Sequence, residues 1–323
     1  MTDSGSPMVS ITMVLYNSER CVGESAASVR GDVRDGFAEL IVVDNASPDA
    51  SVDVARRACP EAEIIQSRMN RYYAGGCNLA WPHVRGRYWL LLNPDVVVPP
   101  GGLRRLTAWM DHHPEIGAAS PDLIDRIGRR HCPARRFPSL SRTLVEMLRL
   151  HRLATLEHQG DFFLGSYWHG REHLDVDWVV GAALIARREA VEAAGVLSEA
   201  LPMYAEDSEW CWRIRRAGFR IGLVGQAPWL HEGEQSTALT WEASERTRRI
   251  WRGIYASCVA RRGRVYTTLL WLANATAFAA EGVHPRRSKT QRALARAMLN
   301  AHAGLLRQRV PARRAESKRP GQP

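Results

Sequence analysis

The sequence lacks a run of apolar residues long enough to cross a membrane. A membrane-spanning helix needs about 20 predominantly apolar residues. The nearest stretch, residues 265–280, carries no charge but is interrupted by threonine and asparagine. Residues 1–8 are mostly polar, so we expect no secretory signal there. These absences exclude a polytopic membrane protein, and they predict that residues 265–280 form a helix that is buried or lies at an interface.

The sequence also lacks the short motifs of several protein classes. Its six cysteines form no Cys-x-x-Cys pair, so we expect reduced core thiols in a cytoplasmic protein rather than a zinc site or a disulfide framework. No Gly-x-Gly-x-x-Gly segment and no phosphate-loop lysine motif occur, which excludes a nicotinamide dehydrogenase. A nucleotidyltransferase would need a glycine-rich loop with a basic residue near the first strand, and residues 16–19 offer neither.

Positive charge is concentrated in the last quarter of the chain. The 323 residues carry a formal net charge of +10. Residues 242–323 hold 18 Lys and Arg against four acids, a balance of +14, which leaves −4 for residues 1–241. This asymmetry predicts a polyanionic partner or, alternatively, a solvated basic tail. Because no zinc-finger, basic-zipper or aromatic-interleaved RNA motif is present, we expect no nucleic-acid partner and favour a peripheral contact with an anionic membrane.

The first 120 residues alternate between strand and helix patterns. Near-continuous apolar strands separated by helices predict a parallel sheet that is covered on both faces. Ligands of such sheets bind beyond the carboxyl ends of the strands, and Asp44 and Asp95 each follow such an end. The predicted strands are residues 9–16, 39–43, 63–66 and 88–92, and the predicted helices are residues 20–29, 51–58, 75–84 and 101–113.

The remaining chain divides into three parts. We predict an α/β domain over residues 1–240, in which residues 126–175 form an irregular, acceptor-side insertion. Residues 241–310 predict a basic helical extension, and residues 311–323 a disordered tail. Within the first part, residues 178–186 predict another strand, and residues 220–224 predict a closing strand before a loop that carries His231.

Asp95 lies where a strand must end. Pro94 cannot donate to a sheet ladder, so we expect the strand to stop there and expose Asp95. A carboxylate with the Asn93 amide two residues earlier suits a hard divalent cation, which prefers oxygen ligands. The alternative is a turn aspartate that bonds to its own backbone. Asp44 has a similar placement, where it would bind a nucleobase or a ribose hydroxyl, or cap the next turn.

Glu206-Asp207 opens a predicted helix. Acids in a first turn complement the helix dipole, and one of the two could instead be a general base. His231 follows the last predicted strand and is either a ligand or an ordinary histidine. Gly75-Gly76, at a helix start, would permit close approach to a phosphate.

Taken in order, these segments resemble the family 2 inverting glycosyltransferases of the GT-A fold, most of all the rhamnosyltransferase-like subgroup. The resemblance covers residues 9–237. Two positions depart from the family pattern, because Tyr72 and Ala80 stand where glycine is common. The motifs that carry the resemblance are VLYN at 14–17, IVVDNAS at 41–47, NRYYAGGCN at 70–78, NPD at 93–95, WVVGA at 178–182, ED at 206–207 followed by WCWR at 210–213, and His231 with Ser236.

The resemblance implies an α/β fold of the GT-A type, a Rossmann-like sandwich with a mostly parallel central sheet, followed by a C-terminal helical extension. It implies metal-dependent, inverting transfer of a rhamnose-like or other hexose from a dTDP- or UDP-linked donor to a glycan, lipid-linked or small-molecule acceptor. Asp207 would be the catalytic base with Glu206 beside it, and Asp95 and His231 would hold Mg²⁺ or Mn²⁺. The implied donor-binding residues are Tyr16, Asn17, Asp44, Asn45, Asn70, Gly75, Gly76, Asn78, Asn93, Asp95, Trp178 and Gly181.

Two alternatives remain open at this point. The chain could be a nucleic-acid- or membrane-binding protein with a degenerate, non-catalytic transferase domain. The extension could dock a cytoplasmic enzyme on the inner face of the cell membrane, or residues 265–280 could pack against the catalytic domain.

Overall fold

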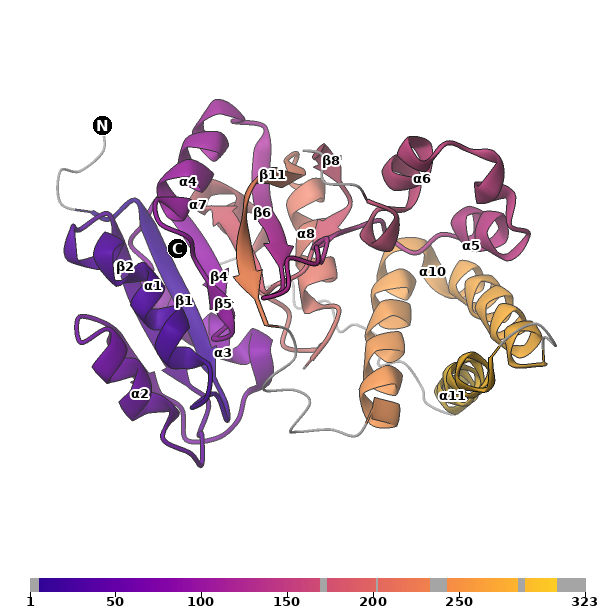
Figure 1. Ribbon diagram of the computed structural model, residues 1–323, viewed down its shortest axis with the longest axis horizontal. Coiled ribbons are helices and arrows are strands. Elements are labelled where there is room, and N and C mark those ends of the chain that lie inside the picture. The colour runs from indigo at the N-terminus through magenta and orange to yellow at the C-terminus, as the bar shows by residue number, and fades with distance from the viewer. Residues whose placement is uncertain (1–5, 169–172, 202, 233–242, 284–287, 307–323) are drawn as a thin grey trace, which may run out of the picture.

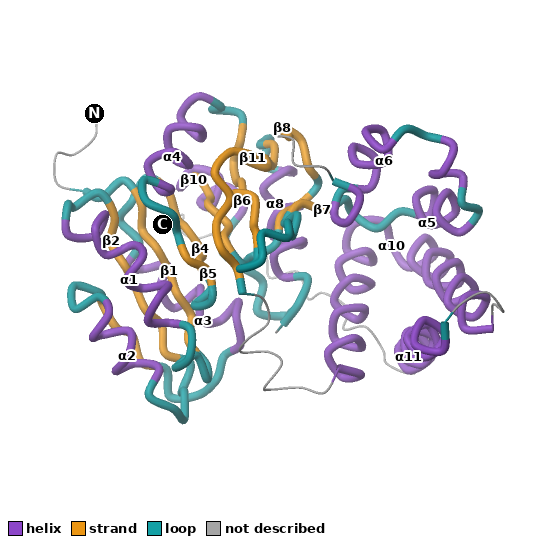
Figure 2. The backbone as a smooth tube through the Cα atoms, in the orientation of Figure 1, coloured by secondary structure: helices purple, strands orange, loops and turns teal. Residues whose placement is uncertain are grey.

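The computed structural model describes residues 6–168, 173–201, 203–232, 243–283 and 288–306. A nine-stranded mixed sheet has helices on both faces, and a group of helices lies together at one end of the molecule (Figures 1 and 2). This arrangement is the expected α/β fold with a C-terminal helical part.

Half of the sheet is parallel, in the order β3-β2-β1-β4. The chain builds outward from β1 to β3 and then places β4 on the other side of β1. Such a switch leaves a crevice at the carboxyl ends of β1 and β4. These strands are β1 (Val9–Leu15), β2 (Ala38–Asp44), β3 (Glu63–Gln66) and β4 (Tyr88–Leu92). They are connected by α1 (Val22–Arg34), α2 (Ser51–Ala58) and α3 (Tyr72–Ala80), and the short turn η1 (Trp81–His83) follows α3.

The other half of the sheet is mixed. β10 (Ala183–Arg187) runs antiparallel between β4 and β6 (Ile116–Ile124), and β11 (Arg220–His231) lies parallel to β6. The short strands β5 (Val96–Val97) and β8 (His173–Val176) both pair with β11. The loop predicted at His231 is wrong, because β11 continues past a register shift and His231 pairs with Val96.

Alternating side chains of the inner strands build two cores. Leu40 and Val42 pack on the side of α1, α2 and α4 (Gly102–His112), whereas Ile41 and Val43 pack on the side of α3, α7 (Arg188–Ala194) and α8 (Glu206–Arg216). This alternation follows from the pleat of a strand that is buried on both faces. The sheet is therefore a rigid platform between two helical layers.

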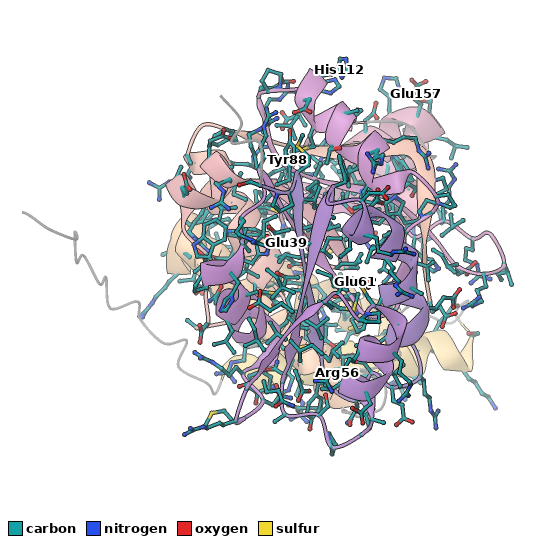
Figure 3. The ribbon with its side chains drawn as sticks, turned by 90° about the vertical axis from the view of Figure 1, so that its left-hand side faces the viewer. Glu39, Arg56, Glu61, Tyr88, His112 and Glu157 are labelled. Atoms are coloured by element: carbon teal, nitrogen blue, oxygen red, sulfur yellow. The ribbon has the colours of Figure 1, made fainter. Side chains whose placement is uncertain are left out.

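A buried polar cluster joins α4 to the sheet. Arg187 donates to the hydroxyl of Tyr88 at 3.1 Å and to the carbonyl of Met110 at 2.7 Å. The Tyr88 hydroxyl in turn donates to Asp111 at 2.6 Å. Figure 3 shows Tyr88 inside the molecule and His112 at its periphery. The buried guanidinium and hydroxyl groups are thus hydrogen-bonded, as burial of polar groups requires.

The segment between β6 and β9 (Trp178–Val179) contains short helices. β7 (Ala134–Arg135) pairs with β9 and precedes α5 (Leu140–Met147) and α6 (Leu156–Phe163). The turns η2 (Leu150–Leu153) and η3 (Gly165–Tyr167) flank α6. Figure 1 shows α5 and α6 at the same end of the molecule as the C-terminal helices.

The C-terminal part consists of α10 (Ala243–Val283) and α11 (Lys289–Leu306). Gly263, with φ of 82°, breaks α10 into two helical halves. The halves contact each other through the amide of Asn274, which donates to the hydroxyl of Tyr255 at 2.9 Å, and the second half contacts α5, where Leu140 N donates to the hydroxyl of Tyr266 at 2.9 Å. The tail predicted at residues 311–323 lies outside the described residues.

Two predictions from the sequence concern the cysteines and the absence of a membrane-spanning helix. All six cysteines lie within the described residues, where they are buried and form no disulfide bond. Across the described segments, no helix combines the length and apolarity needed to cross a bilayer.

Candidate active site

The segments that follow β1 and β2 meet at the carboxyl edge of the parallel strands. Leu15 pairs with Asp44, and the carbonyl of Leu15 accepts from Asn45 N at 2.9 Å. This pairing places Tyr16 and Asn17 beside the Asp44 loop. Asp44 is 6% exposed, and one carboxylate oxygen accepts from Ser47 N at 3.0 Å. The capping contact expected as one alternative for Asp44 is present.

Asn45 and Asn70 fix the shape of the neighbouring loop. The amide of Asn45 donates to the carbonyl of Tyr72 at 2.8 Å and accepts from Arg71 N at 3.1 Å. Asn70 accepts from Tyr72 N at 2.8 Å. Tyr72 has φ of 57°, in the left-handed region that favours glycine, which explains why a tyrosine is unusual at this position. These two asparagines hold the loop that borders the edge.

Gly75 and Gly76 are required by packing. A Cβ on Gly76 would lie 2.6 Å from Cγ1 of Val14, and a Cβ on Gly75 would lie 2.7 Å from Cβ of Arg71. Gly76 therefore lets α3 lie directly against β1, and Gly75 leaves room for the side chain of Arg71 at the start of α3. Asn78, one turn further, binds the backbone of Leu197 through both ends of its amide, at 2.9 and 3.1 Å.

Asp95 and His231 form the candidate cation site. Asp95 is 6% exposed, and its Oδ1 has no hydrogen-bond partner. Nε2 of His231 lies 3.5 Å from this oxygen. A buried carboxylate oxygen without a donor, beside an imidazole, suits a divalent cation. Within the described segments no cluster of three or more His, Cys, Asp or Glu is placed to hold a metal ion.

Gly181 connects the candidate base to α3. Its N–H donates to Oδ2 of Asp207 at 3.1 Å, and its carbonyl accepts from the hydroxyl of Tyr73 at 2.5 Å. A Cβ on Gly181 would lie 3.1 Å from the Tyr73 ring. The next carbonyl, of Ala182, accepts from Asn93 N at 2.8 Å. The segment 181–182 therefore joins the Asn93-Pro94-Asp95 motif to Asp207. Trp178, earlier on the same segment, donates to the carbonyl of Arg136 at 3.3 Å.

Burial shifts the ionisation of both acids at the start of α8. Desolvation raises the pKa of Asp207 to about 6, although N–H groups of Gly181 and Ser208 and the nearby Arg135 guanidinium favour its charged form. Desolvation and the neighbouring Asp207 charge raise the pKa of Glu206 well above its usual value. Oε2 of Glu206 is buried without a hydrogen-bond partner. Burial thus favours the protonated form of Glu206, while the pKa of about 6 lets the neighbouring Asp207 ionise near neutral pH.

The turn before Glu206 is strained and is packed by α10. Tyr204 and Ala205 have φ of 67° and 74°. Gly253 of α10 lies against them: a Cβ there would overlap the carbonyl oxygen of Tyr204 and lie 2.9 Å from Cβ of Ala205. Neither this contact nor the role of Tyr73 could be predicted from motifs, because both depend on packing between segments that are distant in sequence.

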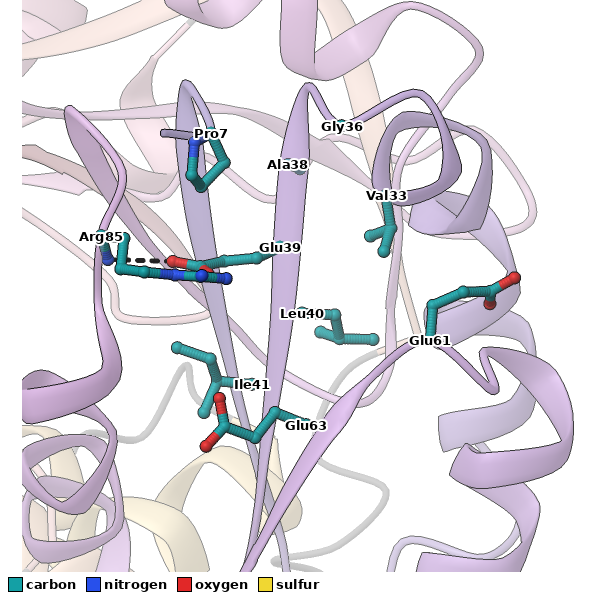
Figure 4. Close-up of a pocket in the computed structure, with 10 residues that line it drawn as sticks. All are labelled: Pro7, Val33, Gly36, Ala38, Glu39, Leu40, Ile41, Glu61, Glu63 and Arg85. Carbon is teal, nitrogen blue, oxygen red and sulfur yellow. Dashed lines mark hydrogen bonds and ion pairs between the residues drawn. The ribbon is translucent and has the colours of Figure 1, made fainter. Parts of the chain in front are cut away.

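A surface hollow of about 300 Å³ lies away from these residues. It is found at the amino ends of the parallel strands, where Pro7, Glu39, Glu61, Glu63 and Arg85 line it (Figure 4). Glu39 pairs with Arg85 and Glu61 with Arg30, so these acids already have cationic partners. We assign no part of the donor site to it, because ligands of such sheets bind at the opposite edge.

The chain is similar to glycosyltransferases both in sequence and in structure. Residues 10–161 match the family model described as Glycosyl transferase family 2. The structure resembles the mannosyltransferase PcManGT of Pyrobaculum calidifontis, solved with GDP-Man and Mn²⁺, with a TM-score of 0.56 at 19% identity over 94% of this chain and 86% of that one. At this identity the likeness shows a shared fold, which is of the GT-A type. The residues that match the family model lie within residues 9–237, over which the motifs resemble the same family, and they make up slightly less than half of the chain.

Two curated relatives share part of their sequence with the chain. The N-acetylglucosaminyl-diphospho-decaprenol L-rhamnosyltransferase of Mycobacterium tuberculosis is 27% identical over 217 residues, 61% of this chain and 67% of the relative. The low-salt glycan biosynthesis hexosyltransferase Agl10 of Haloferax volcanii is 28% identical over 222 residues, 66% of this chain and 64% of the relative. The chain thus spans about two thirds of the length of each relative.

Proposed function

We propose that the chain is a metal-dependent, inverting hexosyltransferase. The single observation that carries this proposal is the bonded path from Asn93 through segment 181–182 to Asp207. That path supports a cation site at Asp95 and a base at Asp207 that share one crevice. A donor diphosphate held by the first would bring its anomeric carbon toward an acceptor hydroxyl held by the second.

Asp95 and His231 would hold Mg²⁺ or Mn²⁺ against the donor diphosphate. When bound, the cation neutralises the negative charge that builds on the departing nucleoside diphosphate. The orphaned Oδ1 of Asp95 supports this assignment. Asp44, Asn17 and Tyr16 border the same edge and would bind the nucleoside.

Asp207 would accept the proton of the acceptor hydroxyl as that oxygen attacks the anomeric carbon. Its bond from Gly181 N fixes Oδ2, and its pKa near 6 leaves it ionised at neutral pH, as a base must be. Attack from the face opposite the leaving group inverts the anomeric configuration in one step. Glu206, whose protonated form burial favours by raising its pKa, would donate a hydrogen bond to a hydroxyl of the sugar or the acceptor.

The relatives guide the choice of substrates. We infer a rhamnose-like or other hexose donor linked to dTDP or UDP. The acceptor is a glycan, a lipid-linked sugar or a small molecule, and the decaprenol-linked acceptor in the mycobacterial relative's name favours the lipid-linked class. The +14 balance of residues 242–323 supports a cytoplasmic enzyme at the inner face of an anionic membrane.

A thermal-shift screen tests the donor. A ligand that binds only the folded state raises the melting temperature by mass action. We expect a UDP- or dTDP-sugar with Mn²⁺ to raise it, and the same compound with EDTA to raise it much less. Equal shifts with Mn²⁺ and EDTA would contradict metal dependence, and no shift with any nucleotide sugar would contradict the donor assignment.

A further inference from the structure

The second half of α10 has two apolar faces. Its inward face carries Leu270, which is fully buried, Asn274, which bonds to Tyr255, and Phe278, which contacts Trp251 with ring centroids 5.8 Å apart. Through these contacts the uncharged stretch packs against the first half of α10. They account for only one side of the helix.

The opposite face forms what we call the outer stripe. Val265, Leu269, Leu272, Thr276, Ala279 and Val283 recur at spacings of three and four residues, and all six are exposed. The exposed fractions of the large members are 79% for Val265, 48% for Leu269, 49% for Leu272 and 74% for Val283. At 1.5 Å per residue the stripe is roughly 27 Å long. Surface helices normally carry charged residues on this side, and residues 265–280 carry none.

Basic side chains adjoin the stripe. Arg262 and Arg264 are exposed at its amino end, within a C-terminal quarter that carries a balance of +14. The segment around α5, which contacts this half of α10, exposes Leu148 to 61% and Leu153 to 85%. A long apolar face beside basic residues is the pattern of a helix that lies in the plane of a membrane interface.

Charge favours a lipid surface over a second copy of the chain. Pairing two outer stripes would bring two segments of +14 together, which like-charge repulsion opposes. Anionic headgroups complement that charge, and basic residues near such a surface add to binding. We propose that the outer stripe docks the protein on an anionic membrane, with its apolar side chains at the headgroup boundary and its arginines against the headgroups. The docking itself does not depend on the proposed function. Only its purpose rests on that function, because an enzyme docked on the membrane would meet a lipid-linked acceptor there.

Vesicle co-sedimentation tests the surface. The full chain is mixed with phosphatidylglycerol-containing vesicles or with phosphatidylcholine vesicles, without any donor. The variant Leu269→Ser/Leu272→Ser removes apolar area from the stripe, and Met69→Ser/Ile127→Ser removes two leucine-sized side chains that are 67% and 78% exposed on the catalytic domain. Because all four residues are exposed, both variants should melt close to wild type, which the melting curve checks.

We expect wild type to pellet with the anionic vesicles and to be released by high salt. The stripe variant should partition at least about tenfold less, because two leucine side chains no longer leave water. The control variant should match wild type. Equal partitioning of wild type and the stripe variant would overturn the proposal, and so would a fall in molar mass from dimer to monomer in the stripe variant. Since no sugar chemistry enters the assay, its failure would leave the transferase proposal standing.

Discussion

The backbone N–H of Gly181 donates to Oδ2 of Asp207 across 3.1 Å, although Gly181 lies in the turn between β9 and β10 and Asp207 lies in α8. Gly181 precedes β10 at the end of the crevice, and Asp207 opens α8. One backbone bond therefore sets the position of the candidate base relative to the sheet. A side chain on Gly181 would crowd the ring of Tyr73, which bonds to the same peptide segment.

Replacement of Asp207 by asparagine should abolish the base while keeping its geometry. The amide oxygen of Asn can still accept from Gly181 N, but it cannot take a proton from the acceptor. We expect transfer to fall by roughly 10²-fold or more, with donor affinity nearly unchanged, as measured by turnover and calorimetry. Asp53→Asn, on exposed α2, serves as the control. Full turnover in Asp207→Asn would show that Asp207 is not the catalytic base, and would leave Glu206 or no carboxylate of this pair in that role.

The pH dependence of transfer should report Asp207. Its burial-raised pKa of about 6 means that the basic form is lost as the pH falls through that value. We expect kcat/KM to decline about tenfold per pH unit below pH 6 in wild type, and the residual activity of Asp207→Asn to lack this inflection. A wild-type profile that stays flat down to pH 4.5 would argue against this group.

Glu206→Gln should stabilise the fold near neutral pH. The pKa of Glu206 is raised in the folded state, so the folded protein binds the proton more tightly than the unfolded chain, and stability falls as the pH rises above the unfolded value. Glutamine does not ionise, so it adds no such pH dependence to the stability of the fold. We expect a melting temperature a few degrees above wild type at pH 7, since ~1 kcal/mol shifts a domain of this size by roughly 2–4 °C. The gain should vanish near pH 4, and an equal gain at both pH values would contradict this explanation.

Asp95→Ala should remove the metal-dependent part of donor binding. Calorimetry of a nucleoside diphosphate with Mn²⁺ and with EDTA measures that part directly. We expect at least about a tenfold loss of affinity with Mn²⁺, which corresponds to roughly 1.4 kcal/mol, and little change with EDTA. His231→Ala should show a loss of the same kind. Asp53→Ala is the exposed control, and wild-type affinity of Asp95→Ala with Mn²⁺ would refute the site.

Gly253→Ala, a substitution in the C-terminal extension, should impair catalysis at the active site. Its methyl group would press on Tyr204 and Ala205, whose strained turn leads into Asp207. We expect kcat to fall several-fold or more with a smaller change in donor KM, together with a lower melting temperature. Gly31→Ala in α1 is the matched control, because nothing lies within 4 Å of its new methyl group and alanine favours the helix by roughly 1 kcal/mol. If both variants behave alike, the contact between α10 and the turn has no catalytic role.

Much of the fold could be predicted from local sequence pattern. β3 and β4 were predicted with the bounds that the structure shows, because β4 is a short apolar run and β3 holds two adjacent isoleucines, and each lies between helices or turns. The end of β11 could not be predicted, since Gly225 and Pro228 suggest a loop. The strand survives them because it shifts register against β6 between Val224 and Trp229. Tertiary pairing overrides the local signal there.

The candidate site was predictable only in part. The motifs identified Asp95, His231 and Asp207, and the structure brings His231 to Asp95 through the pairing of β11 with β5. The same motifs do not distinguish Asn45 and Asn78, whose amides bond to neighbouring backbone, from residues that face a ligand. That distinction depends on which segments fold against each other.

Release of nucleoside diphosphate from a panel of UDP- and dTDP-sugars tests the central claim most directly. The reactions contain Mn²⁺ or EDTA, with lipid-linked and soluble sugar acceptors, and compare wild type with Asp207→Asn. The account predicts that at least one donor is consumed by wild type, that EDTA stops the reaction, that Asp207→Asn is at least about 10²-fold slower, and that the new glycosidic bond has the inverted anomeric configuration. Release that is equal in EDTA and in Asp207→Asn, or a product with retained configuration, would contradict it.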